Sequence, residues 1–315
     1  MNRPKMIIFA NKKSEKMDKQ PKLMDKWRMR DIFKSNIEQI REHAFFSDEI
    51  GILHGHAQVF RMLIQQKPPF IINDHRLGIV VGGEGRVNFN LVDRRIGAGT
   101  LVYLGPGTII NPVSYSDDLE LFGFALFADF PMPFAPGQMP PAFNGQVRDF
   151  QLTVGEDDLM TARQIFELLW QLVRQPHYHR PVASALVAAM MHHYDALYRR
   201  HAEQQSATRS PGQTIFDRFL QLVNQHCHQH HQIGYYAERL CLTERYLSTT
   251  IRQTSGMTAK EWIDRALITR IKVELMHTDK TVAQIADDLH FPNPSFFSKY
   301  FKRIIGTTPK EFREK

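Results

Sequence analysis

The chain of 315 residues has little of several features that define other classes of protein. It contains only two cysteines, Cys227 and Cys241, both within helical patterns, so we expect two buried thiols in a reducing cytoplasm and no redox site. No apolar run approaches the roughly twenty residues that a membrane-spanning helix needs. The N-terminus carries lysines without an apolar segment behind them, which does not resemble a secretion signal. The expectation is a cytoplasmic protein without a membrane partner.

The charge that is present is unevenly distributed along the chain. The formal net charge of +7 combines a strongly basic start, an acidic middle and a basic region after residue 210. A basic C-terminal part beside an acidic middle suits a DNA-binding region attached to a sensory region. We interpret the basic start, residues 1–44, as a partly disordered leader, and contact with phosphates is the alternative for it.

A two-helix pattern near the C-terminus carries the strongest signal in the sequence. Thr281 can cap a helix whose apolar residues follow helical spacing up to Leu289, and a break follows at His290. Asn293 can cap the next helix, which Gly306 ends. Two short helices, a tight turn and a basic outer face indicate a helix-turn-helix unit at residues 281–306.

The same pattern occurs once more, about 50 residues earlier, in residues 233–256. Thr243 takes the place of Asn293 there, and the tail Gly-Met-Thr-Ala-Lys-Glu-Trp answers Gly-Thr-Thr-Pro-Lys-Glu-Phe. Residues 259–276 between the copies read as one continuous helix. A single helix-turn-helix pattern is a weak signal, because any two packed amphipathic helices can imitate it, but an in-register duplication is specific.

These residues resemble a known family. Two helix-turn-helix units joined by one helix, with the ending I-A-x-x-L-x-F-x-x-x-S-F-F-S-K-Y-F-K followed by G-T-T-P-x-E-F-R, are similar to the AraC/XylS regulators of bacterial transcription. The resemblance covers roughly residues 214–313. It departs from the family at His290, where a left-handed glycine is usual, and histidine tolerates that conformation better than most residues. The resemblance implies double-stranded DNA and RNA polymerase as partners.

Each second helix is then expected to lie in a major groove of DNA. Side chains near the start of each helix and pointing outward are candidates for base contacts, since Arg can bind guanine through two hydrogen bonds and Ser and Thr are permissive. The candidate base contacts are Arg245, Ser248, Thr249, Ser295, Ser298 and Lys299. Candidate phosphate contacts, which position without specifying, are Tyr246, Arg252, Lys302 and Arg303.

The middle of the chain has the period of β-strands from about residue 45 to 130. Predicted strands at 60–64, 77–81, 86–92, 100–104 and 119–127 are separated by glycine-rich turns. The cluster Gly82–Gly85 lies between two strands with no helix after it, so we read it as a hairpin and not as a phosphate loop. Short strands with such turns indicate an antiparallel barrel or sandwich.

Residues 97–107 resemble the cupin-type sensor barrel that precedes the DNA-binding part in many of these regulators. Metal-binding cupins place histidines and a glutamate near such turns, but here Asn111 follows the turn, and His54 and His56 precede the regular strands. The histidine run 226–231 sits at a helix end without a second ligand pair, so contact with DNA phosphate is favoured there over metal. We therefore expect no metal, no cofactor and no catalytic residues, and a pocket for an unknown small-molecule effector.

Two helices and a linker connect the two halves. Stripes of apolar residues predict helices near 156–174 and 181–201, which resemble the dimerisation element of the family and would make a homodimer, or else cover an open face of the barrel. The second stripe comprises Ala185, Leu186, Ala189, Met190, His193 and Leu197. Residues 203–213 read as a linker, and a third helix is expected at 214–228.

The expected organisation is α+β, with an N-terminal antiparallel cupin-like barrel and an all-α C-terminal domain. The expected domains are a sensor and dimerisation domain at 45–202 and a DNA-binding domain at 214–315. The expected function is a sequence-specific DNA-binding transcription regulator controlled by a small molecule. The alternative is a cupin-type enzyme with a helical accessory domain, which would need a metal triad or an acid–base pair among the strands.

Overall fold

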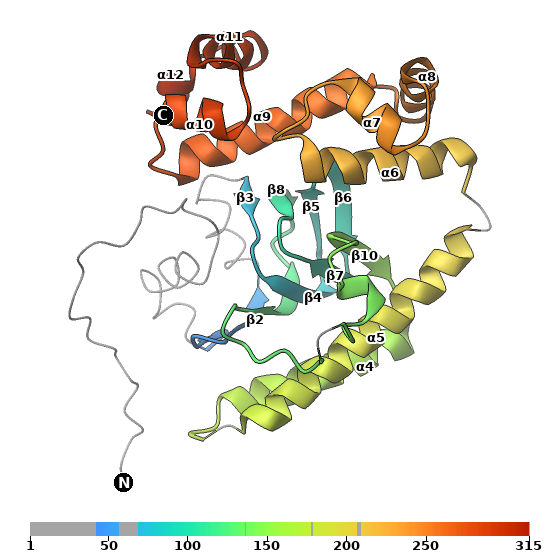
Figure 1. Cartoon of the computed structure of the whole chain (residues 1–315). Helices are drawn as coiled ribbons and strands as arrows, with labels where there is room; N and C mark the ends of the chain where they lie inside the picture. Colours follow the sequence, from blue (N-terminus) through green and yellow to red (C-terminus); the bar gives the residue numbers. More distant parts are fainter. Residues whose placement is uncertain (1–41, 57–68, 136, 178, 207–208, 315) are drawn as a thin grey trace.

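The computed structural model describes residues 42–56, 69–135, 137–177, 179–206 and 209–314. Nearly all of the expected leader, and the predicted strand at 60–64, lie outside these ranges. Two β-sheets form the centre of the molecule, two long helices lie along one side of them and the C-terminal helices lie on another (Figure 1). Among the described helices, none combines the length and the apolar character needed to span a bilayer.

The described strands form two antiparallel sheets. The first has the order β1 (Ala44–Phe46), β2 (Ile50–His56), β9 (Glu120–Leu126), β4 (His75–Gly82), β7 (Thr100–Leu104) and β10 (Asp149–Thr153). The second has the order β3 (Phe70–Ile71), β8 (Ile109–Tyr115), β5 (Glu84–Phe89) and β6 (Val92–Gly97). No strand pairing joins the two sheets within the described ranges, so the predicted barrel is not closed there, and the two antiparallel sheets pack face to face as in the sandwich that the strand pattern also allowed. Strand alternation assigns residues to faces, but it does not say whether outer strands pair.

Two clusters of apolar side chains hold the sheets in layers. Val80 and Val102 of the six-stranded sheet pack with Val87 and Phe89 of the four-stranded sheet. The other face of the six-stranded sheet belongs to the largest core cluster, which it shares with two helices. The resulting layers are helices, six strands and four strands.

The β5–β6 hairpin corrects the prediction of one strand over 86–92. β5 ends at Phe89, and Asn90 and Leu91 turn the chain with φ of 46° and 77°. The Asn90 Oδ1 atom accepts from the backbone N of Ile109 at 2.9 Å, which helps to hold this unusual turn. Asn-Leu lacks the glycine that marks most two-residue hairpin turns, so sequence reasoning ran the strand through it.

β2 was also missed, and with it the position of His54. The His54 ring stacks on Phe122 with centroids 4.1 Å apart, and its Nε2 atom lies 3.1 Å from Glu167 Oε1 on the neighbouring helix. His54 and His56 therefore lie on a regular strand, contrary to the prediction. His54 contributes there to the contact between sheet and helix.

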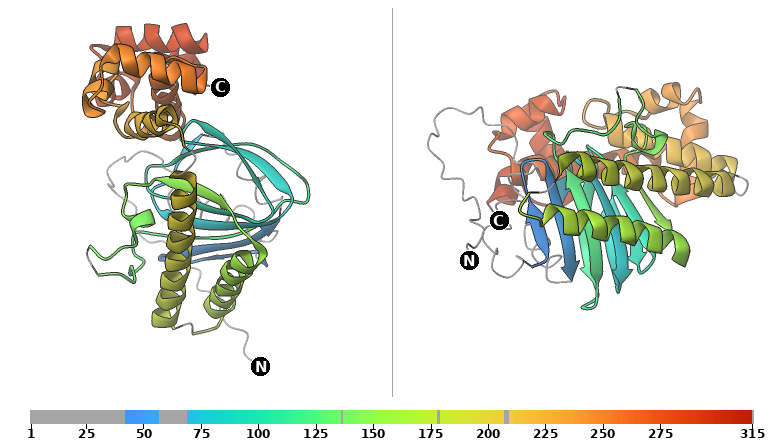
Figure 2. Two further views of the ribbon diagram at one scale, coloured as in Figure 1. Left: turned by 90° about the vertical axis from the view of Figure 1, so that its right-hand side faces the viewer. Right: turned by 90° about the horizontal axis from the view of Figure 1, so that it is seen from below.

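The two long helices are α4 (Glu156–Val173) and α5 (Arg180–Ser206), and they cover the six-stranded sheet (Figure 2). Tyr194 of α5 donates from its hydroxyl to the backbone O of Gly78 at 2.9 Å, and Phe166 of α4 stacks on Phe122. A short helix, η1 (Pro141–Phe143), precedes them within the proline-rich loop. The inward stripe of α5 differs from the predicted one, since Ala185 and Ala189 are exposed. The buried residues are Ala183, Val187, Met190, Met191, Tyr194 and Leu197.

The C-terminal region is entirely helical within its described residues. Its helices are α6 (Pro211–His226), α7 (Ile233–Arg239), α8 (Glu244–Ser255), α9 (Ala259–His277), α10 (Val282–Asp288), α11 (Pro294–Ile305) and α12 (Pro309–Arg313). α6 begins three residues before its predicted start, because Ser210 caps it and Pro211 suits its first position. One apolar cluster surrounds α6, α7 and α8, and a second surrounds α10 and α11. The long helix α9 contributes to both clusters, as its sequence predicts.

Candidate nucleic-acid interface

The second helix-turn-helix unit is built from local signals in its sequence. The Thr281 side chain accepts from the backbone N of Gln284 and begins α10, and Asn293 accepts from Phe296 N and begins α11. His290 takes φ of 56° in the turn between them, which confirms the predicted left-handed residue. Gly306, with φ of 87°, ends α11.

The first unit repeats this construction at matching positions. Thr243 caps α8 by accepting from Tyr246 N, and Gly256 ends it with φ of 75°. Cys241 occupies the place of His290 and has the same φ of 56°. Because a left-handed turn residue projects outward here, Cys241 is exposed, and the prediction that both thiols are buried holds only for Cys227.

Both second helices bury one face and expose the other. Leu247 and Ile251 of α8, and Phe297 and Phe301 of α11, are wholly buried. The short α7 and α10 pack across them through the small residues at the crossing, of which Ala286 is 1% exposed. α8 and α11 lie on the side of the C-terminal region that faces away from the sheets (Figure 1). A straight DNA duplex laid along this side would meet α8 and α11 and not the described strands.

The predicted base-contact residues are distributed over these outward faces. Arg245 and Thr249 of α8 and Ser295 and Lys299 of α11 are exposed, and Ser248 and Ser298 are half-buried. The Thr249 hydroxyl donates to the backbone O of Arg245 at 2.9 Å. Its proton is therefore engaged within the helix, so that its methyl group and its lone pairs are what it offers to a base edge.

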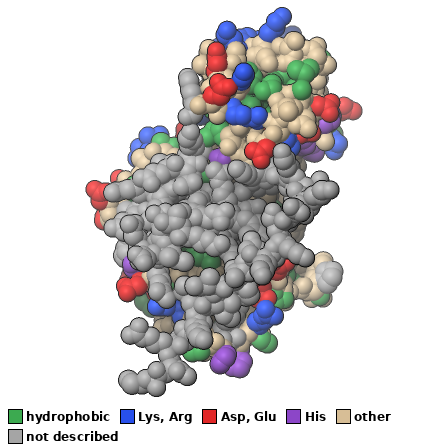
Figure 3. Space-filling view, turned by 90° about the vertical axis from the view of Figure 1, so that its left-hand side faces the viewer, with side chains coloured by type: hydrophobic (Ala, Val, Ile, Leu, Met, Phe, Trp, Pro, Cys, Tyr) green, Lys and Arg blue, Asp and Glu red, His purple; other side chains and the backbone are tan. Residues whose placement is uncertain are grey.

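The predicted phosphate-contact residues lie on the same sides. Arg252, Lys302 and Arg303 are exposed, as is Tyr246. The Arg303 guanidinium lies 5.5 Å from the centre of the Tyr300 ring, which orients it along the helix. Neither Arg245 nor Lys299 forms an ion pair with another described residue. Figure 3 shows Lys and Arg side chains at the upper end of the molecule, over the last helices.

The linking helix α9 fixes the spacing of the two units. Thr258 and Glu261 form a capping box at its start, and Thr308 and Glu311 form the matching box at the start of α12. Tyr300 of α11 donates from its hydroxyl to Asp264 Oδ1 at 2.7 Å, which ties the second unit to the middle of α9. We call α8 and α11, the second helices of the two units, the recognition helices. The distance between them thus depends on one continuous helix.

The histidine run serves packing in this structure. His230 stacks on Tyr235 with ring centroids 3.6 Å apart, and His231 lies against Phe291 of the second unit at 4.9 Å. Burial lowers the pKa of His226, His228 and His231, which favours their neutral forms. Within the described ranges no group of three His, Cys, Asp or Glu residues could hold a metal ion. A phosphate contact from these histidines stays a prediction.

A contact between the sheets and α6 was not predicted. Leu91, at the tip of the β5–β6 hairpin, is 4% exposed and belongs to the apolar cluster of the first helix-turn-helix unit. The Asn224 side chain donates to the backbone O of Asn90 at 3.2 Å, and Arg148 donates to the backbone O of Asn224 at 3.3 Å. We call Asn90, Leu91, Arg148 and Asn224 the hairpin contact. No sequence signal marks it, because an exposed hairpin tip and a buried one can have the same residues.

A second contact lies at the far end of α9. His277 is buried, its Nε2 atom lies 2.8 Å from the backbone O of Pro69, and its ring stacks on Phe70. Both contacts lie at the same end of the four-stranded sheet. The C-terminal helices therefore meet the sheets through α6 and α9, and the described part of the sheets does not cover α8 or α11.

An apolar cavity of about 140 Å³ lies between the two sheets. Gly78 and Gly123 face each other across β4 and β9, and a Cβ atom at Gly123 would approach the Leu77 carbonyl oxygen to 2.9 Å. Phe89 and Ile110 line the opposite side. Arg76 is the one charged residue in the lining, and its Nε atom lies 2.5 Å from Asp74 Oδ1. A cavity of about this size accommodates a benzene-sized molecule in other proteins.

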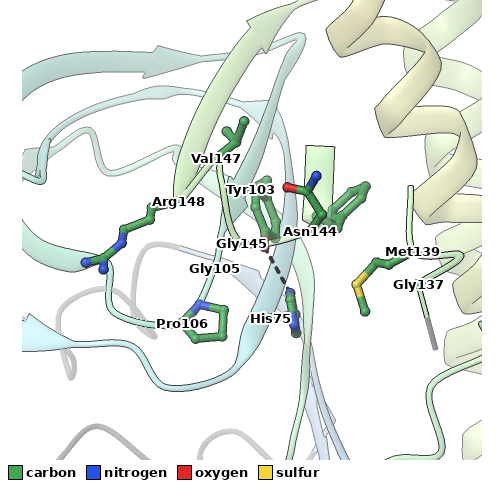
Figure 4. A pocket seen from close by; sticks show the side chains of 11 residues that line it. His75, Tyr103, Gly105, Pro106, Gly137, Met139, Asn144, Gly145, Val147 and Arg148 are labelled. Atoms are coloured by element: carbon green, nitrogen blue, oxygen red, sulfur yellow. Dashed lines mark hydrogen bonds between the residues drawn. The ribbon is translucent and has the colours of Figure 1, made fainter. Parts of the chain in front are cut away.

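A larger and more open pocket, of about 400 Å³, lies beside the proline-rich loop. His75 and Tyr103 form its inner wall with a hydrogen bond of 2.9 Å between Nδ1 and the phenol, and Asn144 and Met139 lie on one side of it (Figure 4). Burial lowers the pKa of His75 and raises that of Tyr103. This pair is therefore uncharged near neutral pH, and the charged residue in the lining of the pocket is Arg148.

The C-terminal region is similar in sequence to known proteins. Residues 236–315 match a family model described as a helix-turn-helix domain. The transcriptional activator RhaR of Escherichia coli K12 is 22% identical over 174 residues, which are 55% of this chain and 61% of RhaR. RhaR of Shigella flexneri is 21% identical over the same length. The aligned part is thus less than two thirds of either relative.

Among solved structures, the chain is similar to ToxT of Vibrio cholerae O395. ToxT is 13% identical, with a TM-score of 0.35, and the match covers 84% of this chain and 96% of that one. The DNA-binding domain of AdpA in complex with a target DNA is 19% identical, with a TM-score of 0.29, over 34% of this chain and 92% of that one. These scores are low, so the assignment of the C-terminal region rests on the sequence matches and on the duplicated units.

Proposed function

By its C-terminal helix-turn-helix domain the chain belongs to the AraC/XylS family of regulators, and we propose that it is a sequence-specific DNA-binding regulator of transcription. The observation that carries this proposal is the duplicated unit, in which α8 and α11 expose polar and basic faces on the side away from the sheets. In a helix-turn-helix the second helix enters the major groove, and two units on one duplex face lie about one helical turn apart. RNA polymerase is the further partner that the family implies.

The outward residues divide by chemistry. Arg245 has the fork geometry that binds guanine O6 and N7, and Thr249 offers its methyl group to thymine. Ser248, Ser295, Ser298 and Lys299 complete the proposed base-contacting set. Tyr246, Arg252, Lys302 and Arg303 are proposed to contact phosphates, where they add affinity and salt dependence without reading sequence.

The N-terminal sheets are proposed to bind a small effector in the cavity between them, as a cupin-like sensor. The cavity is mostly apolar, so a small, largely apolar molecule fits it, and Arg76 gives it one polar contact. Its lining leads directly to the DNA-binding domain. Phe89 and Ile110 line the cavity. The residues next to them, Asn90 and Ile109, form a hydrogen bond with each other, and Leu91 follows Asn90 in the chain.

An effector that pushes β5 and β8 away from the six-stranded sheet would therefore move the hairpin contact against α6. A ligand shifts such an equilibrium only by its differential affinity for the two arrangements. What is regulated is then the placement of the DNA-binding domain, because the recognition helices are uncovered here in any case. In a homodimer that placement would decide whether both chains reach one operator.

A homodimer would use the outer surface of α4 and α5. Met160 and Leu168 of α4 and Val182 of α5 are about half exposed. The two helices also cover the six-stranded sheet, so the two roles considered from the sequence are compatible. The domain organisation that we propose keeps a leader at 1–44, a sensor and dimerisation domain that starts at 45 and a C-terminal DNA-binding domain. The predicted linker at 203–213 is narrowed to the residues between the end of α5 at Ser206 and the start of α6 at Pro211, so the predicted boundaries at 202 and 214 move to those helix ends.

Binding-site selection from random DNA with the purified chain tests the main proposal. One enriched motif with two half-sites is expected, and recovery of random sequence would contradict it. Effector candidates are then screened by thermal shift on the full chain and on residues 210–315. A ligand that stabilises the shorter fragment as much as the full chain would show that the sheets are not the sensor.

A further inference from the structure

A large apolar side chain, Phe296, is exposed on the second recognition helix without a structural reason. Its side chain is 53% exposed, while its neighbour Phe297 is wholly buried in the core of the same unit. Phe291 lies with its ring centroid 6.3 Å from that of Phe296, but Phe296 does not belong to the buried cluster around α11, and about half of its surface is in solvent. The fold therefore does not need a ring at this position.

The first unit carries an exposed ring at the matching position. Tyr246 is 52% exposed and is the third residue of α8, as Phe296 is the third residue of α11. The backbone N of each residue donates to its capping side chain, at 3.2 Å to Thr243 Oγ1 and at 2.8 Å to Asn293 Oδ1. Both rings are thus held in the first turn of their helices, which is the part of a recognition helix that reaches base edges.

The chemistry of phenylalanine limits what Phe296 can contact on DNA. It has no donor or acceptor, so it can bind neither a phosphate oxygen nor the hydrogen-bonding edge of a base. The apolar group that the major groove presents is the 5-methyl group of thymine, for which phenylalanine is a suitable contact. The exposed Ser295 beside it and Lys299 one turn later surround the ring with polar groups.

We propose that Phe296 is a specificity-determining residue of the second unit and packs its ring against the 5-methyl group of one thymine in the operator. The proposal rests on the proposed function and adds to it a base, and the group on that base, that α11 recognises. Phe296 was absent from the contacts predicted from the sequence, which named only polar and charged residues on the outward face of this helix. Tyr246 differs by its hydroxyl, which can donate to a phosphate.

Deoxyuridine tests this directly, because it differs from thymidine only by the missing methyl group. Each thymine of the selected operator is replaced in turn, and the Kd is measured by fluorescence anisotropy for the full-length chain and for Phe296→Ala. Burying one methyl group corresponds to about a fourfold change in Kd. The wild-type chain is expected to lose about that factor at one position, and Phe296→Ala is expected to bind thymine and uracil there equally.

Ile304→Ala is the matched control, since Ile304 is 41% exposed on the last turn of the same helix. It should keep the wild-type ratio between thymine and uracil. If Phe296→Ala also keeps that ratio at every position, the ring does not read a methyl group and the inference is wrong. Enrichment of an operator without any effect of uracil would overturn this inference alone. Failure to enrich any sequence would overturn the proposed function itself.

Discussion

The two helix-turn-helix units share one construction and differ in what surrounds it. Caps at Thr243 and Asn293, left-handed residues at Cys241 and His290, and terminal glycines recur at matching places. The first unit, however, has α6 in contact with the β5–β6 hairpin, whereas the second meets the sheets, within the described residues, near the end of α9. The duplication preserves what a recognition helix needs. The divergence gives the two units different contacts with the sheets.

The largest effect is expected from removing a buried ring of the second unit. Phe297→Ala should lower the free energy of unfolding by about 3–5 kcal/mol, because a wholly buried ring is lost from the cluster around α11. Leu247→Ala in the first unit should cost about 2–5 kcal/mol. Urea unfolding followed by circular dichroism measures both. An unshifted transition for Phe297→Ala would place that ring outside the core.

The next effect concerns the hairpin contact and should separate the two units. Leu91→Ala removes a buried side chain from the cluster around α6, at a cost of roughly 2 kcal/mol or more. Hydrogen exchange should then become faster in α6, while α10 and α11 keep the wild-type rates. Val113→Ala, at a half-exposed position on β8, is the control and should leave hydrogen exchange in α6, α10 and α11 at the wild-type rates. Faster exchange in both units alike would mean that the contact supports the whole domain.

Arg245→Ala should weaken binding to the selected operator by about 1–3 kcal/mol and relax the preference at one base pair. The control is Lys302→Ala, which should weaken binding to all DNA sequences about equally. It should also reduce the salt dependence of the binding constant by about one released ion. Titrations at several salt concentrations distinguish the two. If Arg245→Ala lowers specific and nonspecific binding equally, Arg245 contacts a phosphate.

The smallest effect is a gain in stability. Cys241 and His290 both hold φ of 56°, which costs a side-chain-bearing residue about 1–2 kcal/mol relative to glycine. Cys241→Gly and His290→Gly should each raise the free energy of unfolding, by about 1 kcal/mol once the greater chain entropy of glycine is deducted. Similar gains in the two units would confirm that their turns are equivalent. Alanine at either position should bring no gain, because it keeps the strain.

The helical half could be predicted from the sequence because its signals are local. Capping residues such as Thr281 and Asn293, and glycines such as Gly306, act within one turn of the residues that they organise, and the duplication provides each signal twice. The outward residues of the recognition helices follow from the same periodicity. Phe296 was overlooked because only polar and charged side chains were considered as DNA contacts on α11, although the periodicity that buries Phe297 turns Phe296 outward.

The sheets were predicted less well because strand pairing is not local. Asn90 and Leu91 turn the chain with no glycine, and what holds them is a hydrogen bond to Ile109 and the helix α6 far along the chain. His54 was placed outside the strands because the residues that cover β2 come from β9 and α4. The predicted stripe of α5 contained the exposed Ala185 and Ala189, since alanine fits either environment.

The spacing of the two half-sites tests the central claim most directly. α9 is one rigid helix that holds α8 and α11 apart, so both recognition helices can dock only at half-sites about one helical turn apart. Insertion of about five base pairs between the half-sites, or of about ten, should lower the affinity to that of a single half-site. The Kd of the full-length chain for these operators gives the answer. Unchanged affinity for either insertion would contradict the claim that both units read one operator.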